Sequence, residues 1–196
     1  MLEHDALLLA AGGSRRLGHS KARLRRDGEA LITRSARVLA SQQSVRRVAV
    51  LGHDAEALAD YLPTDWVCVT NAHWQEGMAS SLQCGLAALA TSRPVLVAGI
   101  DQPGLDPSHI HALLSAAGEA NEAAIVSDYG GAFGLPALLP RCLHSRAGEL
   151  SGDRGFKPLI HRADVPCVHV AAPELALDVD TAEDLDKARQ RGWIDT

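Results

Sequence analysis

The stretch that decides the fold is Leu9-Ala10-Ala11-Gly12-Gly13-Ser14-Arg15-Arg16-Leu17-Gly18-His19-Ser20-Lys21, which continues an apolar run over residues 6–8. A strand-like run that ends in glycines and bases predicts an anion-binding loop, because glycines let backbone N–H groups approach an anion and Arg and Lys supply countercharge. The alternative is an ordinary glycine turn with surface bases. Two familiar phosphate motifs do not fit. A Walker A loop has Lys directly after its last glycine, whereas two residues separate Gly18 from Lys21 here. The dinucleotide-binding pattern G-x-G-x-x-G is absent as well, because Gly12 and Gly13 are adjacent.

The remainder of the chain alternates short apolar, β-branched runs with longer segments of helical spacing. This alternation predicts an α/β fold with a mostly parallel sheet and helices on both faces. Asp106 and Thr181 are expected as N-caps of the last two helices, with Asp184 completing a capping box at the second. Strands are expected at residues 6–11, 47–51, 66–70, 94–100, 123–127 and 165–170, and helices at 31–39, 55–62, 78–90, 107–117 and 181–190.

The composition is that of a soluble protein with one domain. A length of 196 residues suits a single domain over residues 1–196. No apolar run approaches the roughly 20 residues of a membrane-spanning helix. The N-terminus carries acids where an export signal carries bases, so a cytoplasmic protein without a membrane partner is expected. The four cysteines lack the spacing of a metal site and are expected to be buried free thiols.

Charge is unevenly distributed along the chain. A net charge of −5 argues against nucleic acid as a partner. Six bases fall between Arg15 and Arg26, whereas acids crowd the stretch 174–186, where they can hold a cation. Asp101 directly follows the fourth predicted strand, and ligands in such sheets lie beyond the carboxyl ends of the strands. Its carboxylate suits Mg²⁺, which prefers hard oxygen ligands. A helix cap or a turn former is the alternative role.

The first loop resembles a known signature. Its residues match the pattern L-A-A-G-x-S-x-R-x-G-x-x-K of the nucleotidyltransferase superfamily, which has a GT-A-like, three-layer Rossmann domain. The resemblance implies that Arg16 and Lys21 are catalytic residues that stabilise charge on the phosphates. Asp101-Gln102-Pro103 is similar to the superfamily's D-x-P, which makes Asp101 a catalytic ligand of Mg²⁺ or Mn²⁺. The residues implied to wrap a nucleoside triphosphate are Leu9, Ala10, Ala11, Gly12, Gly13, Ser14, Arg16 and Lys21.

A second resemblance lies in the C-terminal acidic stretch. The sequence Asp178-Val179-Asp180-Thr181-Ala182-Glu183-Asp184-Leu185 is similar to the superfamily's D-I-D-T-P-E-D-L, with Ala182 in place of proline. It implies that Asp180 or Asp178 completes the metal site, and Asp180 is preferred. Alternation along an extended segment sends both side chains to the same face, so the two alternatives stay open. Asp184 is expected to cap the helix and not to bind metal.

Two further blocks resemble those of molybdenum cofactor cytidylyltransferases and their close relatives. The stretch 71–82 matches N-x-x-W-x-x-G-M-x-x-S-L, and the resemblance implies that Asn71, Ser80 and Ser81 contact the nucleotide. The stretch 150–157 is similar to L-x-G-D-x-G-A-R, with Phe156 and Lys157 in place of Ala and Arg, and residues 134–136 are similar to G-x-P. The residues implied to bind the acceptor are Gly134, Gly152, Asp153 and Lys157.

The implied reaction joins CMP from CTP to molybdopterin or its molybdenum-loaded form and releases pyrophosphate. An acceptor phosphate oxygen attacks the α-phosphorus in line, so no protein nucleophile is needed. Ala11 favours CTP, since cytidylyltransferases of this branch carry L-A-A-G and their guanylyltransferase relatives L-A-G-G. The alternatives are guanylyl transfer, transfer to a sugar phosphate or an isoprenoid precursor, and a non-catalytic carrier of the molybdenum cofactor. A monomer is expected, with transient contact to a molybdoenzyme or its maturation chaperone.

Overall fold

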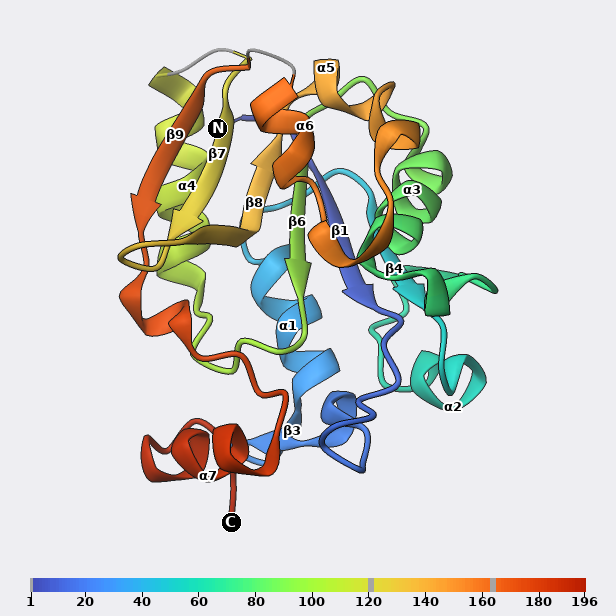
Figure 1. The fold of residues 1–196 in the computed structure, drawn as a ribbon, viewed down its shortest axis with the longest axis vertical. Helices are drawn as coiled ribbons and strands as arrows, with labels where there is room; N and C mark the ends of the chain where they lie inside the picture. Colours follow the sequence, from blue (N-terminus) through green and yellow to red (C-terminus); the bar gives the residue numbers. More distant parts are fainter. Residues whose placement is uncertain (1, 120–121, 163–164) are drawn as a thin grey trace.

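The core of the molecule is a seven-stranded sheet, seen in a computed structural model that describes residues 2–119, 122–162 and 165–196 (Figure 1). The strand order is β5-β4-β1-β6-β8-β7-β9, and every neighbouring pair is parallel except those that involve β8. The strands are β1 Asp5–Ala10, β4 Arg47–Leu51, β5 Val67–Thr70, β6 Val95–Gly99, β7 Ala124–Asp128, β8 Phe133–Leu139 and β9 Cys167–Ala171, and a separate hairpin pairs β2 Arg25–Arg26 with β3 Glu29–Ala30.

Helices cover both faces of this sheet (Figure 1). Successive residues of a strand point to opposite faces, so Leu8 packs in one apolar layer with α1, α2 and α4, whereas Leu7 packs in the other with α3, α5 and α6. The α-helices are α1 Leu31–Ala40, α2 Ala55–Ala59, α3 Met78–Leu89, α4 Pro107–Glu119, α5 Arg141–His144, α6 Lys157–Arg162 and α7 Ala182–Gln190. The 3₁₀ turns are Lys21–Arg23, Trp74–Glu76, Ala147–Glu149, Gly152–Arg154 and Pro173–Ala176.

A third, smaller apolar cluster lies below the carboxyl edge of the sheet. It joins Leu17 of the glycine-rich loop to Leu31 of α1 and to Val179 and Leu185 of the C-terminal segment. The helix α7 therefore packs beside the first loop although it is the last helix of the chain (Figure 1). This cluster brings together the two ends of the sequence that carry the candidate phosphate-binding and metal-binding residues.

The predicted architecture is confirmed. All six predicted strands are present, with ends shifted by no more than two residues, and the sheet is mostly parallel. Asp106 caps α4, because its Oδ1 accepts hydrogen bonds from the backbone N–H groups of Ser108 at 2.8 Å and His109 at 3.2 Å. Thr181 and Asp184 form the expected capping box at α7.

Several elements were not anticipated. The antiparallel strand β8 contains Gly134 and Pro136, which disguise its β pattern. The β2–β3 hairpin and the short helices α5 and α6 also went unpredicted. The cysteines are free, as expected, but the prediction that they are buried is wrong: Cys68 and Cys142 are exposed, and Cys84 and Cys167 are only partly buried. Among the described helices, none has the length and apolar character needed to cross a bilayer.

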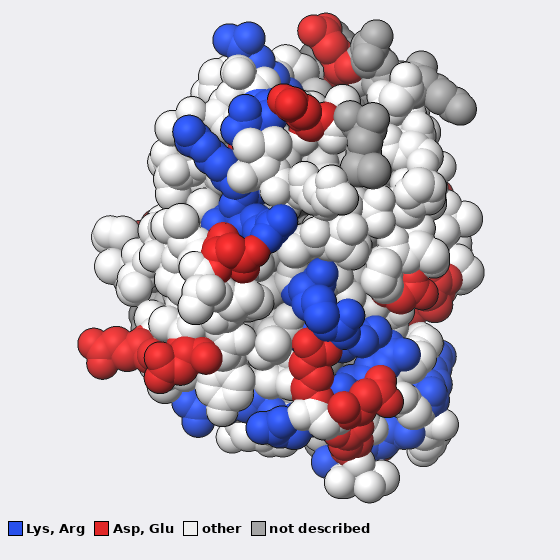
Figure 2. All heavy atoms as spheres, turned by 180° about the vertical axis from the view of Figure 1, so that it is seen from behind, with Lys and Arg blue, Asp and Glu red and all other residues white. Residues whose placement is uncertain are grey.

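Surface charge on the rear of the molecule is mixed in sign. In the view of Figure 2, blue basic and red acidic side chains lie interspersed, and no extended area of one sign covers that face. Ion pairs elsewhere in the described chain follow the same pattern, as between Arg37 and Glu29 at 2.7 Å. Mixed surfaces of this kind do not produce the long-range field that steers a polyanion.

The contact of α3 with the sheet yields a stability prediction. A Cβ added at Gly85 would overlap the side chain of Leu7 and would lie 3.0 Å from Val50 Cγ2, whereas a Cβ at Gly118 of α4 would meet nothing within 4 Å. We expect Gly85→Ala to lower the free energy of unfolding by about 1–3 kcal/mol through overpacking. The control, Gly118→Ala, should raise it by about 0.5–1 kcal/mol. Urea denaturation measures both, and equal stability of the two variants would contradict this packing.

Candidate functional site

The candidate site lies where β1 and β6 end, at the carboxyl edge of the sheet. The glycine-rich loop follows β1, and Asp101 follows β6 after Ile100. The backbone N–H of Val179 donates to the carbonyl oxygen of Asp101 at 2.8 Å, which fixes the C-terminal acidic segment beside the end of β6. Residues separated by most of the chain length are thereby brought to one point.

A compact network of ion pairs occupies this point. Lys21 Nζ lies 2.7 Å from Asp180 Oδ1 and 3.8 Å from Asp101 Oδ2, and Arg16 Nη2 lies 2.6 Å from Asp180 Oδ2. Burial alone would raise the pKa of Asp180, but hydrogen bonds and charges from Lys21 and Arg16 lower it below its ordinary value. The hydroxyl of Ser14 accepts a hydrogen bond from the backbone N–H of Lys21 at 3.1 Å and so closes the loop on itself. The predicted catalytic residues are thus brought together.

Asp178 is the third carboxylate and has a different environment. It lines a cavity together with Asp101 and Gln102. Desolvation in this cavity, together with the negative charges of Asp101 and Asp180, raises the pKa of Asp178 to about 7. No basic side chain of the described residues forms an ion pair with it. A cation bound here would relieve the repulsion between Asp178 and Asp101, which Lys21 relieves only partly.

The residues present fit a hard divalent cation. Three carboxylates, at Asp101, Asp178 and Asp180, approach one another at the edge of the sheet, and carboxylate oxygens are the ligands that Mg²⁺ and Mn²⁺ prefer. The described part of the chain contains no ready-made group of three metal-binding side chains. Such a group is not required, because Mg²⁺ usually takes one or two carboxylates from the protein and completes its shell with substrate phosphates and water.

Asn71, Ser80 and Ser81 form one hydrogen-bond network. The side-chain amide of Asn71 donates to the hydroxyls of Ser80 at 2.9 Å and Ser81 at 3.1 Å, and its oxygen accepts from the backbone N–H of His73 at 2.9 Å. Asn71 and Ser81 are buried. The polar atoms of Asn71 are therefore used within the protein, where they fasten the turn 72–77 onto the start of α3.

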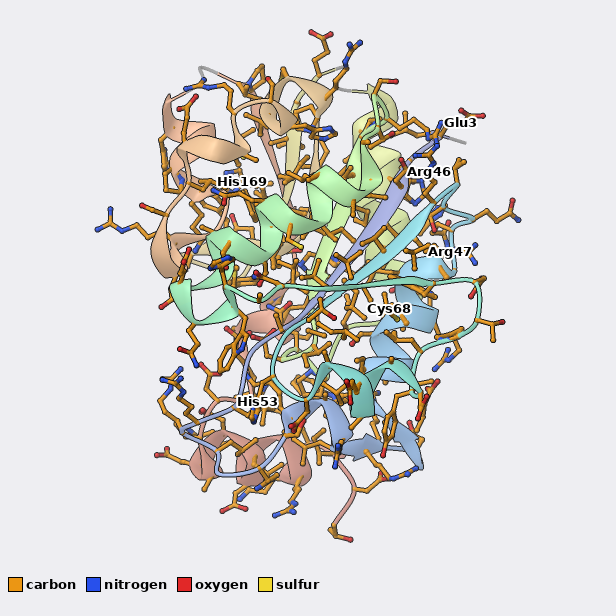
Figure 3. The ribbon with its side chains drawn as sticks, turned by 90° about the vertical axis from the view of Figure 1, so that its right-hand side faces the viewer. Glu3, Arg46, Arg47, His53, Cys68 and His169 are labelled. Carbon is orange, nitrogen blue, oxygen red and sulfur yellow. The ribbon has the colours of Figure 1, made fainter. Side chains whose placement is uncertain are left out.

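Trp74 and His53 were not singled out from the sequence as site residues, yet they pack against the first loop. A Cβ at Gly13 would lie 3.1 Å from Trp74 and 3.3 Å from His53, and these two rings contact each other at a tilt of 38° with centroids 5.5 Å apart. His53 lies at the carboxyl end of the sheet in Figure 3, whereas Arg46 and Arg47 lie at the opposite end. Arg15 covers the indole at 5.4 Å, so a cation–π contact holds the loop on this side. The only sequence signal for Trp74 was its place in the 71–82 block.

The predicted acceptor residues surround the cavity, whose volume is about 630 Å³. Gly134, Asp153 and Lys157 line it, and Gly152 adjoins Asp153. Gly77 has a φ of +104°, and a Cβ there would lie 2.5 Å from Asp153 Oδ1, so only glycine lets the loop 152–155 approach the start of α3. Asp153 uses this approach to accept a hydrogen bond from the backbone N–H of Met78 at 3.3 Å.

Gln102 and Tyr129 were also not predicted from the sequence. The side-chain amide of Gln102 donates to the Tyr129 hydroxyl and to the carbonyl oxygen of Leu175, each at 3.0 Å. The Tyr129 hydroxyl in turn donates to the carbonyl oxygen of Leu135, and burial raises its pKa well above the ordinary value. Both residues line the cavity and brace its wall, and neutral Tyr129 stays protonated at physiological pH.

Comparison with known proteins identifies the chain. Residues 6–167 match the model of the MobA-like NTP transferase domain, which is more than half of the sequence. The chain belongs to this family. The glycine-rich loop and Asp101 both fall within the matched range, whereas Asp178 and Asp180 follow it. The ion-pair network therefore belongs to a nucleotidyltransferase of the MobA-like family.

Individual relatives of this nucleotidyltransferase differ in their names. The nicotine blue oxidoreductase of Paenarthrobacter nicotinovorans is 31% identical over 192 residues, covering 91% of this chain and 93% of that protein. The crystal structure of Rv0371c from Mycobacterium tuberculosis H37Rv is 27% identical with a TM-score of 0.79, covering 95% and 96% of the two chains. Another structure of Rv0371c, a complex with manganese, is 24% identical with a TM-score of 0.71, and the match covers 94% of this chain and 97% of that chain. Molybdopterin-guanine dinucleotide biosynthesis protein A from Archaeoglobus fulgidus shares the fold, with 18% identity and a TM-score of 0.69 over 94% and 97%.

The environment of Asp178 leads to a prediction about pH. Because its pKa is higher in the folded protein than its ordinary value of 3.8, the folded state binds more protons between about pH 4 and 7. Stability from this group is therefore lost as the pH rises through that window and is fully lost above about pH 7. Asp178→Asn should raise the Tm of the metal-free protein at pH 8, and the difference from wild type should shrink towards pH 5.

The control for this experiment is Glu3→Gln, which removes an exposed acid outside the site. It should leave the pH profile of the Tm unchanged. At pH 8, added Mg²⁺ or Mn²⁺ should raise the Tm of the wild type more than it raises the Tm of the Asp178→Asn variant. The ion neutralises the same repulsion that the substitution removes. An Asp178→Asn variant that is less stable than wild type at pH 8 without metal would contradict the assigned environment.

Proposed function

We propose that the protein transfers CMP from CTP to molybdopterin or its molybdenum-loaded form and releases pyrophosphate. The observation that carries this proposal is the junction of Arg16 and Lys21 with Asp101 and Asp180 at the end of β6. Two cations and a set of carboxylates at one sheet edge suit a triphosphate bound with a divalent metal. The family and the adjoining cavity support the same reading.

The chain's own residues supply positioning and charge. Arg16 and Lys21 would neutralise oxygens of the triphosphate, which lowers the barrier to pyrophosphate departure. Asp101 with Asp178 or Asp180 would hold Mg²⁺ or Mn²⁺, and this ion supplies further positive charge at the phosphates when bound. The manganese complex of Rv0371c supports such a site. Asp153 and Lys157, in the cavity wall, would hold the acceptor so that its phosphate oxygen faces the α-phosphorus.

The preference for CTP depends on Ala11. It is buried at the end of β1, and its carbonyl oxygen accepts a hydrogen bond from the backbone N–H of His53 at 3.1 Å. In this proposal the methyl group would narrow the space open to the base, which would favour a pyrimidine. A difference of one methyl group changes the discrimination between two substrates by only about 1–3 kcal/mol. GTP is therefore the nucleotide that competes with CTP in this proposal. The proposed enzyme acts in the cytoplasm as a monomer and passes its product to a molybdoenzyme or its maturation chaperone.

The deciding experiment incubates the protein with Mg²⁺, molybdopterin or molybdenum cofactor, and each nucleoside triphosphate in turn, and identifies products by mass. CTP should give a cytosine dinucleotide and pyrophosphate. Asp101→Ala should reduce pyrophosphate release about 100-fold or more, because a metal ligand is lost. Preference for GTP would overturn the base assignment, and reaction only with a sugar or isoprenoid phosphate would overturn the acceptor.

Two rival functions have their own readouts in that experiment. If the protein is a non-catalytic carrier, the wild type and the Asp101→Ala variant should bind the pterin equally well, and neither should release pyrophosphate. The name of the Paenarthrobacter relative raises an oxidoreductase as a second candidate. Oxidation or reduction of nicotine blue by the protein, without any nucleotidyl transfer, would favour that candidate.

Replacement of Asp180 is expected to strengthen CTP binding without metal and to weaken turnover with metal. Its two oxygens hold Lys21 at 2.7 Å and Arg16 at 2.6 Å, so these cations must exchange partners before they bind phosphates. Asp180→Asn should therefore strengthen CTP binding severalfold in EDTA, as measured by isothermal titration calorimetry, and should weaken turnover with Mg²⁺. The control is Asp186→Asn on α7, which removes the same charge from an exposed position near Arg189. Weaker metal-free binding by Asp180→Asn would contradict this exchange.

A further inference from the structure

The loop that follows Asp101 is held through its backbone by two arginines from the segment that follows the glycine-rich loop. Arg26 Nη1 donates to the carbonyl oxygen of Pro103 at 2.6 Å, and Arg34 Nη2 donates to that of Leu105 at 3.3 Å. Pro103 is close in the chain to Asp101, which the proposed function makes a metal ligand. Arg26 therefore anchors the stretch of backbone that carries the Asp101 carboxylate.

Arg26 is unusually buried for a residue of this basic stretch. It is the last of the six bases that begin at Arg15, yet its side chain is only 21% exposed. Its Nε is buried without a hydrogen-bond partner and lies 3.6 Å from Asp27 Oδ2. Burial, together with the like charges of Arg26 and Arg37, lowers the pKa of Arg34. Neighbouring, partly desolvated guanidinium groups cost free energy, so the arrangement favours a role for Arg26 beyond stability.

The hairpin that carries Arg26 is itself fixed by the C-terminal segment. The two carboxylate oxygens of Asp195 accept hydrogen bonds from the backbone N–H groups of Asp27 and Gly28, each at 2.9 Å. The backbone N–H of Asp195 donates to the carbonyl oxygen of Arg25 at 2.8 Å. Because its hairpin is held at the turn, Arg26 can support the loop after Asp101 from a fixed base.

The position of Lys21 relative to Asp101 depends on the same support. Lys21 begins the turn that leads into β2, and its Nζ lies 3.8 Å from Asp101 Oδ2. Two contacts therefore join this segment to the loop after β6, one at Lys21 and one between Arg26 and Pro103. The contact at Lys21 must loosen when Lys21 binds a phosphate. The contact of Arg26 can persist and keep the two segments in place.

We infer that Arg26 is a positioning residue for the metal site, which holds the Asp101 carboxylate in place through the carbonyl group of Pro103. The inference rests on the metal site of the proposed function. It predicts an effect opposite to that of charge alone, because loss of a positive charge strengthens cation binding whereas loss of a support weakens it. Residues that orient metal ligands without touching the metal typically change its affinity about 10–100-fold.

The test measures the binding of Mn²⁺ alone to the whole chain at pH 8, from the loss of the EPR signal of free Mn²⁺. Arg26→Gln should raise the Kd for Mn²⁺ about tenfold, and Arg26→Lys, which keeps a charge and a donor, should restore most of the affinity. Arg34→Gln removes the same charge from the neighbouring arginine, whose carbonyl partner lies further from Asp101, and Arg23→Gln removes an exposed base. Both controls should leave the Kd unchanged or lower it.

The Tm of each variant without metal reports folding separately. If Arg26→Gln does not fold, Asp195→Asn takes its place, because it loosens the hairpin and leaves Arg26 intact. Asp195→Asn should then weaken Mn²⁺ binding, with Asp186→Asn as its matched charge control, and an unchanged Kd would overturn the inference.

The remaining outcomes separate the inference from the proposed function. Equal or tighter Mn²⁺ binding by Arg26→Gln overturns the inference, as does an equal loss in Arg34→Gln. Absence of Mn²⁺ binding by the wild type removes the metal site and overturns both. Normal Mn²⁺ binding by the wild type without any nucleotidyl transfer overturns the proposed function alone, and a raised Kd in Arg26→Gln then still supports the inference.

Discussion

Mutual repulsion among three carboxylates at the end of β6 is the constraint on which the candidate site depends. Asp101, Asp178 and Asp180 are held together by the main-chain hydrogen bond from Val179 to Asp101, so they cannot move apart freely. Lys21 and Arg16 balance part of this charge through Asp180. Burial, together with the remaining repulsion from Asp101 and Asp180, raises the pKa of Asp178. A folded protein tolerates such an arrangement where a ligand supplies the missing charge, which is why strongly perturbed groups gather at functional sites.

The loop that supplies the balancing cations is itself held from several sides. Leu17 anchors it to α1 and α7 through the lower apolar cluster, and Trp74 packs over Gly13 at its start. The ion pair between Lys21 and Asp180 joins residues 159 positions apart in the chain. A short loop held by packing at both ends presents its backbone N–H groups in a fixed arrangement, and preorganised donors of this kind contribute most to stabilising developing charge.

Much of this arrangement could be predicted from sequence because the signals are local. Strands such as β1 and β6 are apolar runs with clear ends. Asp106 and Thr181 directly precede segments of helical spacing, and this position predicts them as N-caps. The strand β8 could not be predicted in this way, since its Gly134 and Pro136 are unfavourable in an isolated strand and its pairing with β6 and β7 is non-local. Among the site residues, Arg16, Lys21 and Asp101 were named in advance. The pairing of Arg16 and Lys21 with Asp180 rather than Asp178 depends on side-chain geometry that alternation along the chain cannot resolve.

The contact between Gly77 and Asp153 shows how the two halves of the site depend on one another. Asn71 fastens the turn 72–77 to α3, and the same turn presents Trp74 to the glycine-rich loop. Gly77 ends this turn and lets Asp153, in the wall of the cavity, bond to the first residue of α3. A displacement of the glycine-rich loop would therefore be transmitted through Trp74 and Gly77 to the part of the cavity wall that carries Asp153. The proposed reaction would depend on this rigidity, because its two substrates would have to meet in line and small errors in their relative position are costly to the rate.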